Sequence, residues 1–160
     1  MTRKEKSSAK LPATKEMRYA ILPYRMPPIP TEKMTSAQKK AAAEISAGPR
    51  GQLIGPFWPI LRSPGFMSPF QKVGEYCRFH SPLDKRINEM AALMAAKAWT
   101  QQFEWDVHIR HAKAAGLKAA IPEAIAEGRR PTGMAEDEEI LYDFLTELLT
   151  NMSVSDATYG

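Results

Sequence analysis

The chain has 160 residues, of which 44% are hydrophobic and 25% charged, a composition typical of one ordinary soluble domain. Its single cysteine, Cys77, excludes an intramolecular disulfide and a dithiol active site within one chain. The net charge of +4 is unevenly distributed. Residues 1–50 carry 11 lysines and arginines and 4 acidic residues, whereas residues 134–160 carry no lysine or arginine and 7 acidic residues. Because the basic residues are scattered and interrupted by proline, we expect a disordered tail over residues 1–17 rather than a nucleic-acid-binding surface.

The first twenty residues lack the apolar core of a targeting peptide, and no apolar run approaches the length that spans a membrane. We therefore expect a cytoplasmic protein whose partners include neither a membrane nor a nucleic acid.

Proline dominates the first part of the chain, because ten of the 13 prolines lie in residues 12–69, where a Pro-Pro-Ile-Pro run favours an extended segment. Thr35 and Gln38 form a capping-box pattern, which predicts a short helix ending at Gly48. Residues 51–64 are punctuated by glycine and proline and allow at most two irregular helical turns.

A helical period follows Ser63. Phe66, Phe70, Val73 and Cys77 recur at spacings of three and four residues, which predicts one apolar stripe facing the core. On that stripe, we expect Cys77 to be a small buried hydrophobe rather than a reactive thiol.

The next helix is predicted from Asp84 to about Thr100. Five alanines between Ala91 and Ala98 favour close packing, so we expect this helix to be central. Glu89 has two equally supported interpretations: an exposed acid favoured by the helix dipole, or a half-buried carboxylate with a raised pKa.

The helix predicted from Gln102 to Ala115 ends in a glycine C-cap at Gly116 and carries the candidate chemistry. Glu104 and His108 are four residues apart and His111 follows three later, so one carboxylate and two imidazoles share a helical face. Such a set can bind a divalent metal, but the two histidines lack the spacing of four that zinc proteases use. We expect no metal here.

A carboxylate and an imidazole beside aromatic side chains suit general acid/base chemistry at neutral pH. Glu89 on the preceding helix, Gln101 at the junction and Trp105 extend this candidate site. The simpler alternative is a surface hydrogen bond between Glu104 and His108.

Two further helices are predicted, over residues 118–127 and 136–152, with Gly128 ending the first. No strand-like alternation exceeds four residues, so the predicted fold class is all-α, a compact helical bundle. Residues 154–156 look like the start of one more helix, and we expect that a C-terminal helix has been lost.

Taken in order, Glu89, Gln101 to Glu104, His108 and the Ala-Gly-Leu that follows resemble the carboxymuconolactone decarboxylase and alkyl hydroperoxidase D superfamily. The resemblance runs from about Arg18 to Ala157. It implies one helical domain of the alkyl hydroperoxidase D-like type over residues 18–160.

The peroxidase branch of this superfamily carries a glutamate, then Cys-x-x-Cys, and a histidine four residues after the second cysteine. Glu89 and His108 match the glutamate and the histidine, but Gln101 and Glu104 stand at the two cysteine positions. The chain therefore resembles the decarboxylase-like branch that lacks the redox motif.

This resemblance implies a cofactor-independent lyase or isomerase that acts on a small carboxylated or lactone substrate. His108 would be the general acid/base, Glu104 would orient it or act as a second acid, and Glu89 would act as a relay. His111, Gln101 and Trp105 are candidates for lining the substrate pocket.

Arg110, Arg129 and Arg130 are candidates for neutralising a substrate carboxylate, and the sequence does not select among them. The resemblance also implies a homo-oligomer, a trimer or a hexamer. Two alternatives stay open: a hydroperoxide reductase, which the missing thiols disfavour, and a non-catalytic binding or structural member of the family.

Overall fold

The computed structural model describes residues 26–160, so the tail predicted over residues 1–17 and the start of the proline-rich segment lie outside the described residues. Every regular element in the described part of the chain is a helix, and no strand occurs there, which confirms the all-α prediction. The described part of the chain divides into two compact units, residues 26–73 and 74–160.

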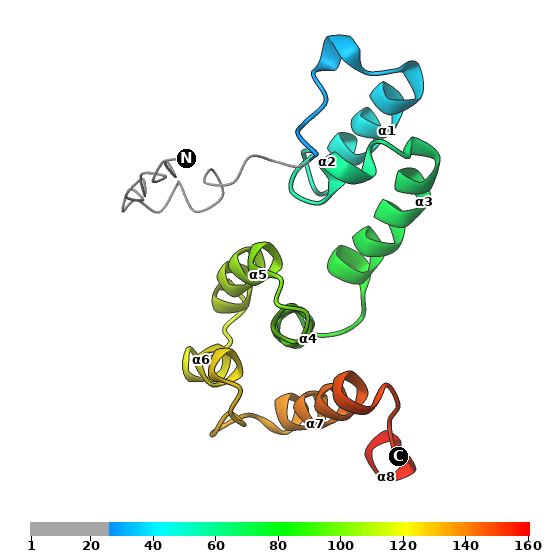
Figure 1. Ribbon diagram of the computed structural model, residues 1–160. Coiled ribbons are helices and arrows are strands. Elements are labelled where there is room, and N and C mark those ends of the chain that lie inside the picture. Colours follow the sequence, from blue (N-terminus) through cyan, green and yellow to red (C-terminus); the bar gives the residue numbers. More distant parts are fainter. Residues whose placement is uncertain (1–25) are drawn as a thin grey trace, which may run out of the picture. The chain divides into compact units, whose positions relative to one another are not determined.

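The first unit contains a 3-10 turn (Thr31–Lys33), α1 (Ser36–Ala47), α2 (Phe57–Ile60) and most of α3 (Pro64–Glu75), as Figure 1 shows. The predicted capping box begins α1: the Thr35 hydroxyl accepts from Gln38 N at 3.2 Å, and the Gln38 amide oxygen accepts from Thr35 N at 2.9 Å. The core of this unit combines side chains from all three helices and the turn after α2: Ala41, Ile45, Phe57, Leu61 and Met67.

The apolar stripe predicted to face the core is wrong. All four of its residues are exposed: Phe66, Phe70, Val73 and Cys77. The buried face of α3 instead carries Met67 and Gln71, each one residue further along. Neighbouring residues point about 100° apart on a helix, so a stripe displaced by one residue faces a different direction.

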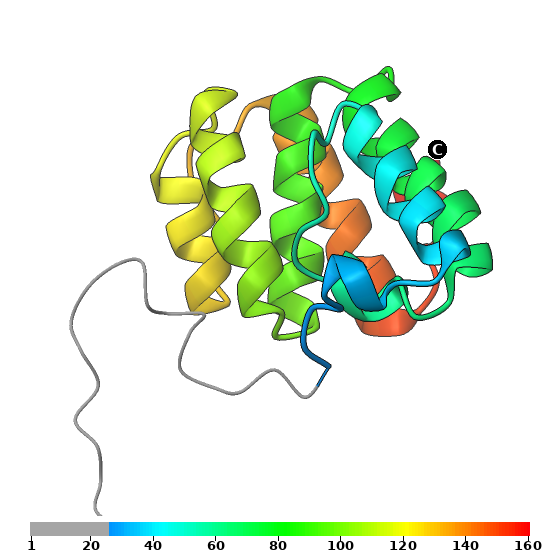
Figure 2. The same ribbon diagram turned by 90° about the horizontal axis from the view of Figure 1, so that it is seen from above.

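The second unit begins with a π-helical turn, Tyr76–His80, and continues with five α-helices: α4 (Lys85–Ala98), α5 (Gln102–Ala114), α6 (Ala120–Glu127), α7 (Glu136–Asn151) and α8 (Asp156–Tyr159). The predicted central helix is confirmed, because α4 contacts α5, α6 and α7 (Figure 2). The last helix, α8, starts where one was predicted and has four residues. Within residues 26–160, no helix is both long and apolar enough to cross a membrane.

Local capping explains where these helices begin and end. The Asp84 carboxylate accepts from Arg86 N at 2.8 Å and begins α4. After α5, Gly116 takes a φ of +90°, and Leu117 N donates to Ala112 O at 2.9 Å, as in the predicted glycine C-cap.

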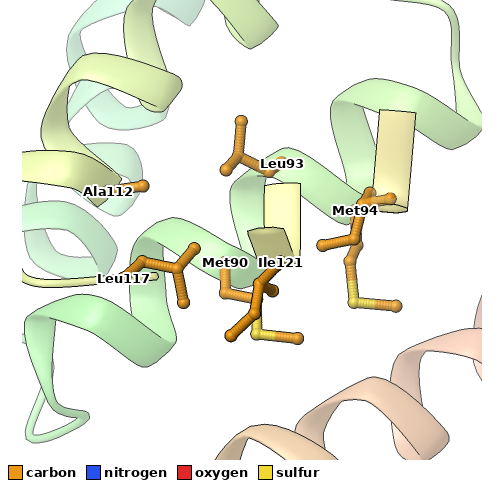
Figure 3. Close-up of a cluster of buried hydrophobic side chains, with 7 residues drawn as sticks. Met90, Leu93, Met94, Ala112, Leu117 and Ile121 are labelled. Atoms are coloured by element: carbon orange, nitrogen blue, oxygen red, sulfur yellow. The ribbon is translucent and has the colours of Figure 1, made fainter. Parts of the chain in front are cut away.

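This C-cap turns Leu117 into the core of the second unit. Figure 3 shows the buried cluster there, to which α4 contributes three side chains. The cluster comprises Met90, Leu93, Met94, Ala112, Leu117, Ile121 and Ile125.

Arg86 links α4 to α7 through two carboxylates. Its Nη2 lies 2.5 Å from Asp137 Oδ2, and its Nη1 contacts the carboxylate of Glu138. The Glu138 side chain is only 3% exposed, and its Oε2 also accepts from Ala135 N at 2.7 Å. A carboxylate this deeply buried depends on its cation, because removing the partner leaves an uncompensated charge.

Replacing Arg86 by methionine should therefore lower the free energy of unfolding by about 2–4 kcal/mol. Arg130→Met is the matched control, because the ion pair of Arg130 with Asp143 is half exposed on both sides and should contribute no more than about 1 kcal/mol. Urea denaturation measures both variants. Equal losses would contradict a special role for the buried pair.

Candidate functional site

Glu89 on α4 and His108 on α5 meet in a short hydrogen bond. Nδ1 of His108 lies 2.6 Å from Glu89 Oε2; the Glu89 side chain is 0% exposed and that of His108 15%. Of the two interpretations of Glu89, the exposed helix-start acid is wrong, and the carboxylate is buried. The expected raised pKa is also wrong: burial does raise the pKa of Glu89, but the hydrogen bond from His108 and the positive charges of His108 and Lys85 outweigh burial and lower the pKa overall.

His108 lies between two carboxylates. On the side away from Glu89, its Nε2 lies 3.5 Å from Oε2 of Glu104, whose side chain is 39% exposed. Burial lowers the pKa of His108, but the hydrogen bonds to Glu104 and Glu89 outweigh burial and raise the pKa above its ordinary value. The arrangement therefore favours an imidazolium with a buried carboxylate at Nδ1 and a more open one at Nε2.

Lys85 completes the surroundings of the buried carboxylate. Its Nζ lies 3.2 Å from Glu89 Oε1, one helical turn away, and it also donates to the backbone oxygen of Arg78 at 2.7 Å. Each oxygen of Glu89 thus has a cationic partner when His108 is protonated. The sequence analysis missed Lys85, although its spacing of four from Glu89 is a signal that points to it.

His111 has a different partner. Its Nε2 lies 2.7 Å from Nη2 of Arg78, which belongs to the turn Tyr76–His80. Because a guanidinium can only donate, this nitrogen accepts, so His111 is neutral with its proton on Nδ1. Burial and the positive charge of Arg78 lower the pKa of His111.

Two neighbouring imidazoles therefore favour opposite protonation states. The ring centroids of His108 and His111 are 6.5 Å apart. Pairs of titratable groups whose surroundings separate their pKa values are typical of acid/base sites.

The structure brings four of the predicted site residues together. His108 contacts Glu89 and Glu104, and the ring of His111 is centred 6.5 Å from that of His108. Gln101 instead donates its side-chain amide to Trp99 O at 3.2 Å, and Trp105 packs against the core of the second unit. In the described part of the chain, no three His, Cys, Asp or Glu side chains are arranged to hold a metal ion.

The three arginines proposed from sequence to meet a substrate carboxylate differ in their surroundings. Arg129 pairs with Glu127 at 2.5 Å, and Arg130 pairs with Asp143, so the charges of these two are already matched within the chain. Arg110 is exposed on α5.

The two imidazoles should titrate on opposite sides of the ordinary histidine pKa of 6.5. NMR of the ring C–H groups against pH, assigned with His80→Gln, His108→Gln and His111→Gln, should place His108 above this value and His111 below it. Glu89→Gln should lower the pKa of His108, because it removes a negative charge that favours the imidazolium. A His108 that titrates below His111 would contradict this assignment.

Residues 64–138 match the model of the carboxymuconolactone decarboxylase family. No curated protein and no solved structure matches the chain at a significant level. The matched stretch runs from the start of α3 into α7 and includes Glu89, Glu104, His108 and His111. This match confirms the resemblance inferred from the sequence: over residues 64–138 the chain is similar to the carboxymuconolactone decarboxylase family.

Proposed function

We propose that the protein is a carboxymuconolactone decarboxylase-like enzyme that uses His108 as a general acid/base on a small carboxylated or lactone substrate. The observation that carries this proposal is the 2.6 Å hydrogen bond between His108 Nδ1 and Glu89 Oε2. It occupies Nδ1 on the buried side and leaves Nε2, beside the more exposed Glu104, as the nitrogen that can exchange a proton with a substrate.

Glu89 acts in this proposal as a positioning residue. A buried carboxylate that accepts Nδ1–H fixes the orientation of the imidazole and stabilises its protonated form, as the acid of a catalytic triad does. Glu104 is then the carboxylate at the reacting nitrogen. The sequence analysis gave the orienting role to Glu104, whereas this proposal gives it to Glu89.

The chemistry fits a protonated His108. When a substrate carboxylate leaves as carbon dioxide, the electron pair of the broken carbon–carbon bond stays on the substrate. That carbon then takes the proton from His108 Nε2, and the neutral imidazole regains a proton from water, favoured by the negative charge of Glu104.

Peroxide reduction is the weaker alternative. It requires a thiolate that attacks the peroxide and a second thiol that resolves the product, whereas the chain has one cysteine. Cys77 is exposed on the turn Tyr76–His80, and Gln101 and Glu104 occupy the positions of the family's cysteine pair. A non-catalytic member of the family is the other alternative, and the direct contacts of His108 with Glu89 at 2.6 Å and with Glu104 at 3.5 Å argue against a decayed site.

We further propose that the enzyme works in the cytoplasm as a trimer or hexamer and needs no cofactor. Light scattering of the purified full chain measures the assembly. A monomer would contradict that part of the proposal.

Decarboxylation of carboxymuconolactone, measured as release of carbon dioxide, tests the proposed activity. His108→Gln should lower kcat by a factor of about 100 or more, because it removes the proton donor. His80→Gln is the matched control: His80 is exposed and has no hydrogen bond to the group around Glu89. A His108→Gln variant that folds by circular dichroism and keeps its full rate would refute the role of His108.

The pH profile should follow the same group. Activity should fall as pH rises through the raised pKa of His108, because the acid form is lost there. In Glu89→Gln this fall in activity should occur at lower pH, because one of the carboxylates that favour the imidazolium is gone. If the fall occurs at the same pH as in the wild type, the titrating group is not His108.

A further inference from the structure

The charge of Arg78 is not matched by a carboxylate within the described residues. Its guanidinium contacts the Nε2 of His111 at 2.7 Å, and its carbon lies 5.2 Å from the centroid of the Phe79 ring. Its Nε is buried and has no hydrogen-bond partner among residues 26–160. By contrast, Arg86 and Arg130 each lie against a carboxylate.

The group around Glu89 consequently has a surplus of positive charge. Arg78, Lys85 and a protonated His108 contribute +3, and Glu89 and Glu104 contribute −2, which leaves +1. A ligand with one negative charge placed at Arg78 would bring this sum to zero.

A neutral imidazole is a weak partner for a guanidinium. The planar fork of an arginine pairs best with a carboxylate, through two parallel charge-assisted hydrogen bonds. Arg78 is partly exposed and His111 is exposed, so a small ligand reaches this pair from solvent.

We propose that Arg78 and His111 form an anion-binding subsite that holds a carboxylate of the substrate beside His108. This inference rests on the proposed function for the identity of the reacting group, but not for the binding itself. Arg78 would then be the residue that selects an acidic substrate over a neutral one.

The position of the subsite suits this task. The His111 ring, which Arg78 touches, is centred 6.5 Å from the His108 ring, a distance that a small molecule can span. The held carboxylate is one that the reaction retains, because pairing with a guanidinium stabilises the anion and opposes its loss as carbon dioxide.

Binding of acetate to the full chain tests the subsite without turnover. At about pH 7, where the ordinary histidine pKa leaves most neutral imidazole in place, sodium acetate replaces sodium chloride at constant ionic strength while NMR follows the ring of His111. Acetate should displace the imidazole from Arg78 and shift this signal in a saturable way. Acetamide, the neutral analogue, should have no such effect.

The variants separate this subsite from a general salt effect. Arg78→Gln should abolish the saturable shift, and Arg78→Lys, which keeps the charge but loses the fork, should weaken acetate binding by about tenfold. Lys113→Gln removes an exposed cation two residues beyond His111 and should change nothing. Absence of a saturable shift in the wild type, or the same affinity in Arg78→Lys or Arg78→Gln, would overturn the proposal.

Turnover distinguishes failure of the subsite from failure of the proposed function. His108→Gln should lose activity and keep the acetate response, whereas Arg78→Gln should raise KM by about tenfold or more with a smaller change in kcat. An acetate response in a wild type without decarboxylase activity would refute the proposed function alone. Normal KM in Arg78→Lys and Arg78→Gln would refute the subsite alone.

Discussion

A buried hydrogen bond between Glu89 and His108 is the interaction on which the candidate site depends. A carboxylate with no exposed surface is costly to charge unless cations surround it. His108 and Lys85 supply one for each of its oxygens, from α5 and from the preceding turn of α4. The contacts that stabilise Glu89 as an anion therefore also fix the imidazole ring and leave its other nitrogen toward Glu104.

The surrounding charges give two similar side chains, His108 and His111, different protonation states. His108 lies between carboxylates and favours the imidazolium, whereas His111 accepts from Arg78 and favours the neutral ring. Because the rings are close, the protonated His108 on α5 lies near Arg78, whose charge is not matched by a carboxylate among the described residues. The proposed proton transfer and the proposed recognition of an acidic substrate thus rest on one arrangement of charges.

Local sequence signals predicted much of this arrangement. The capping signals at Thr35 and Gly116 indicated helix boundaries, and the spacing on α5 placed Glu104, His108 and His111 on one face. The spacing of the apolar residues in α3 predicted that they share one face of the helix, but it did not show whether that face is buried. Exposed apolar side chains can recur at the same spacing as buried ones. No local sequence pattern pointed to Arg78, because its partner His111 lies 33 residues away in the chain. The lowered pKa of Glu89 likewise depends on His108, which lies 19 residues away.

The central claim is that Glu89 holds His108 as an imidazolium while Arg78 holds His111 neutral. Nitrogen-15 NMR of the imidazole rings at pH 6.5, the ordinary histidine pKa, reads this protonation directly. The account predicts that His108 is mainly protonated on both ring nitrogens, and that His111 is mainly neutral with its proton on Nδ1 and an unprotonated Nε2. A neutral His108, or a His111 protonated on Nε2, would contradict it.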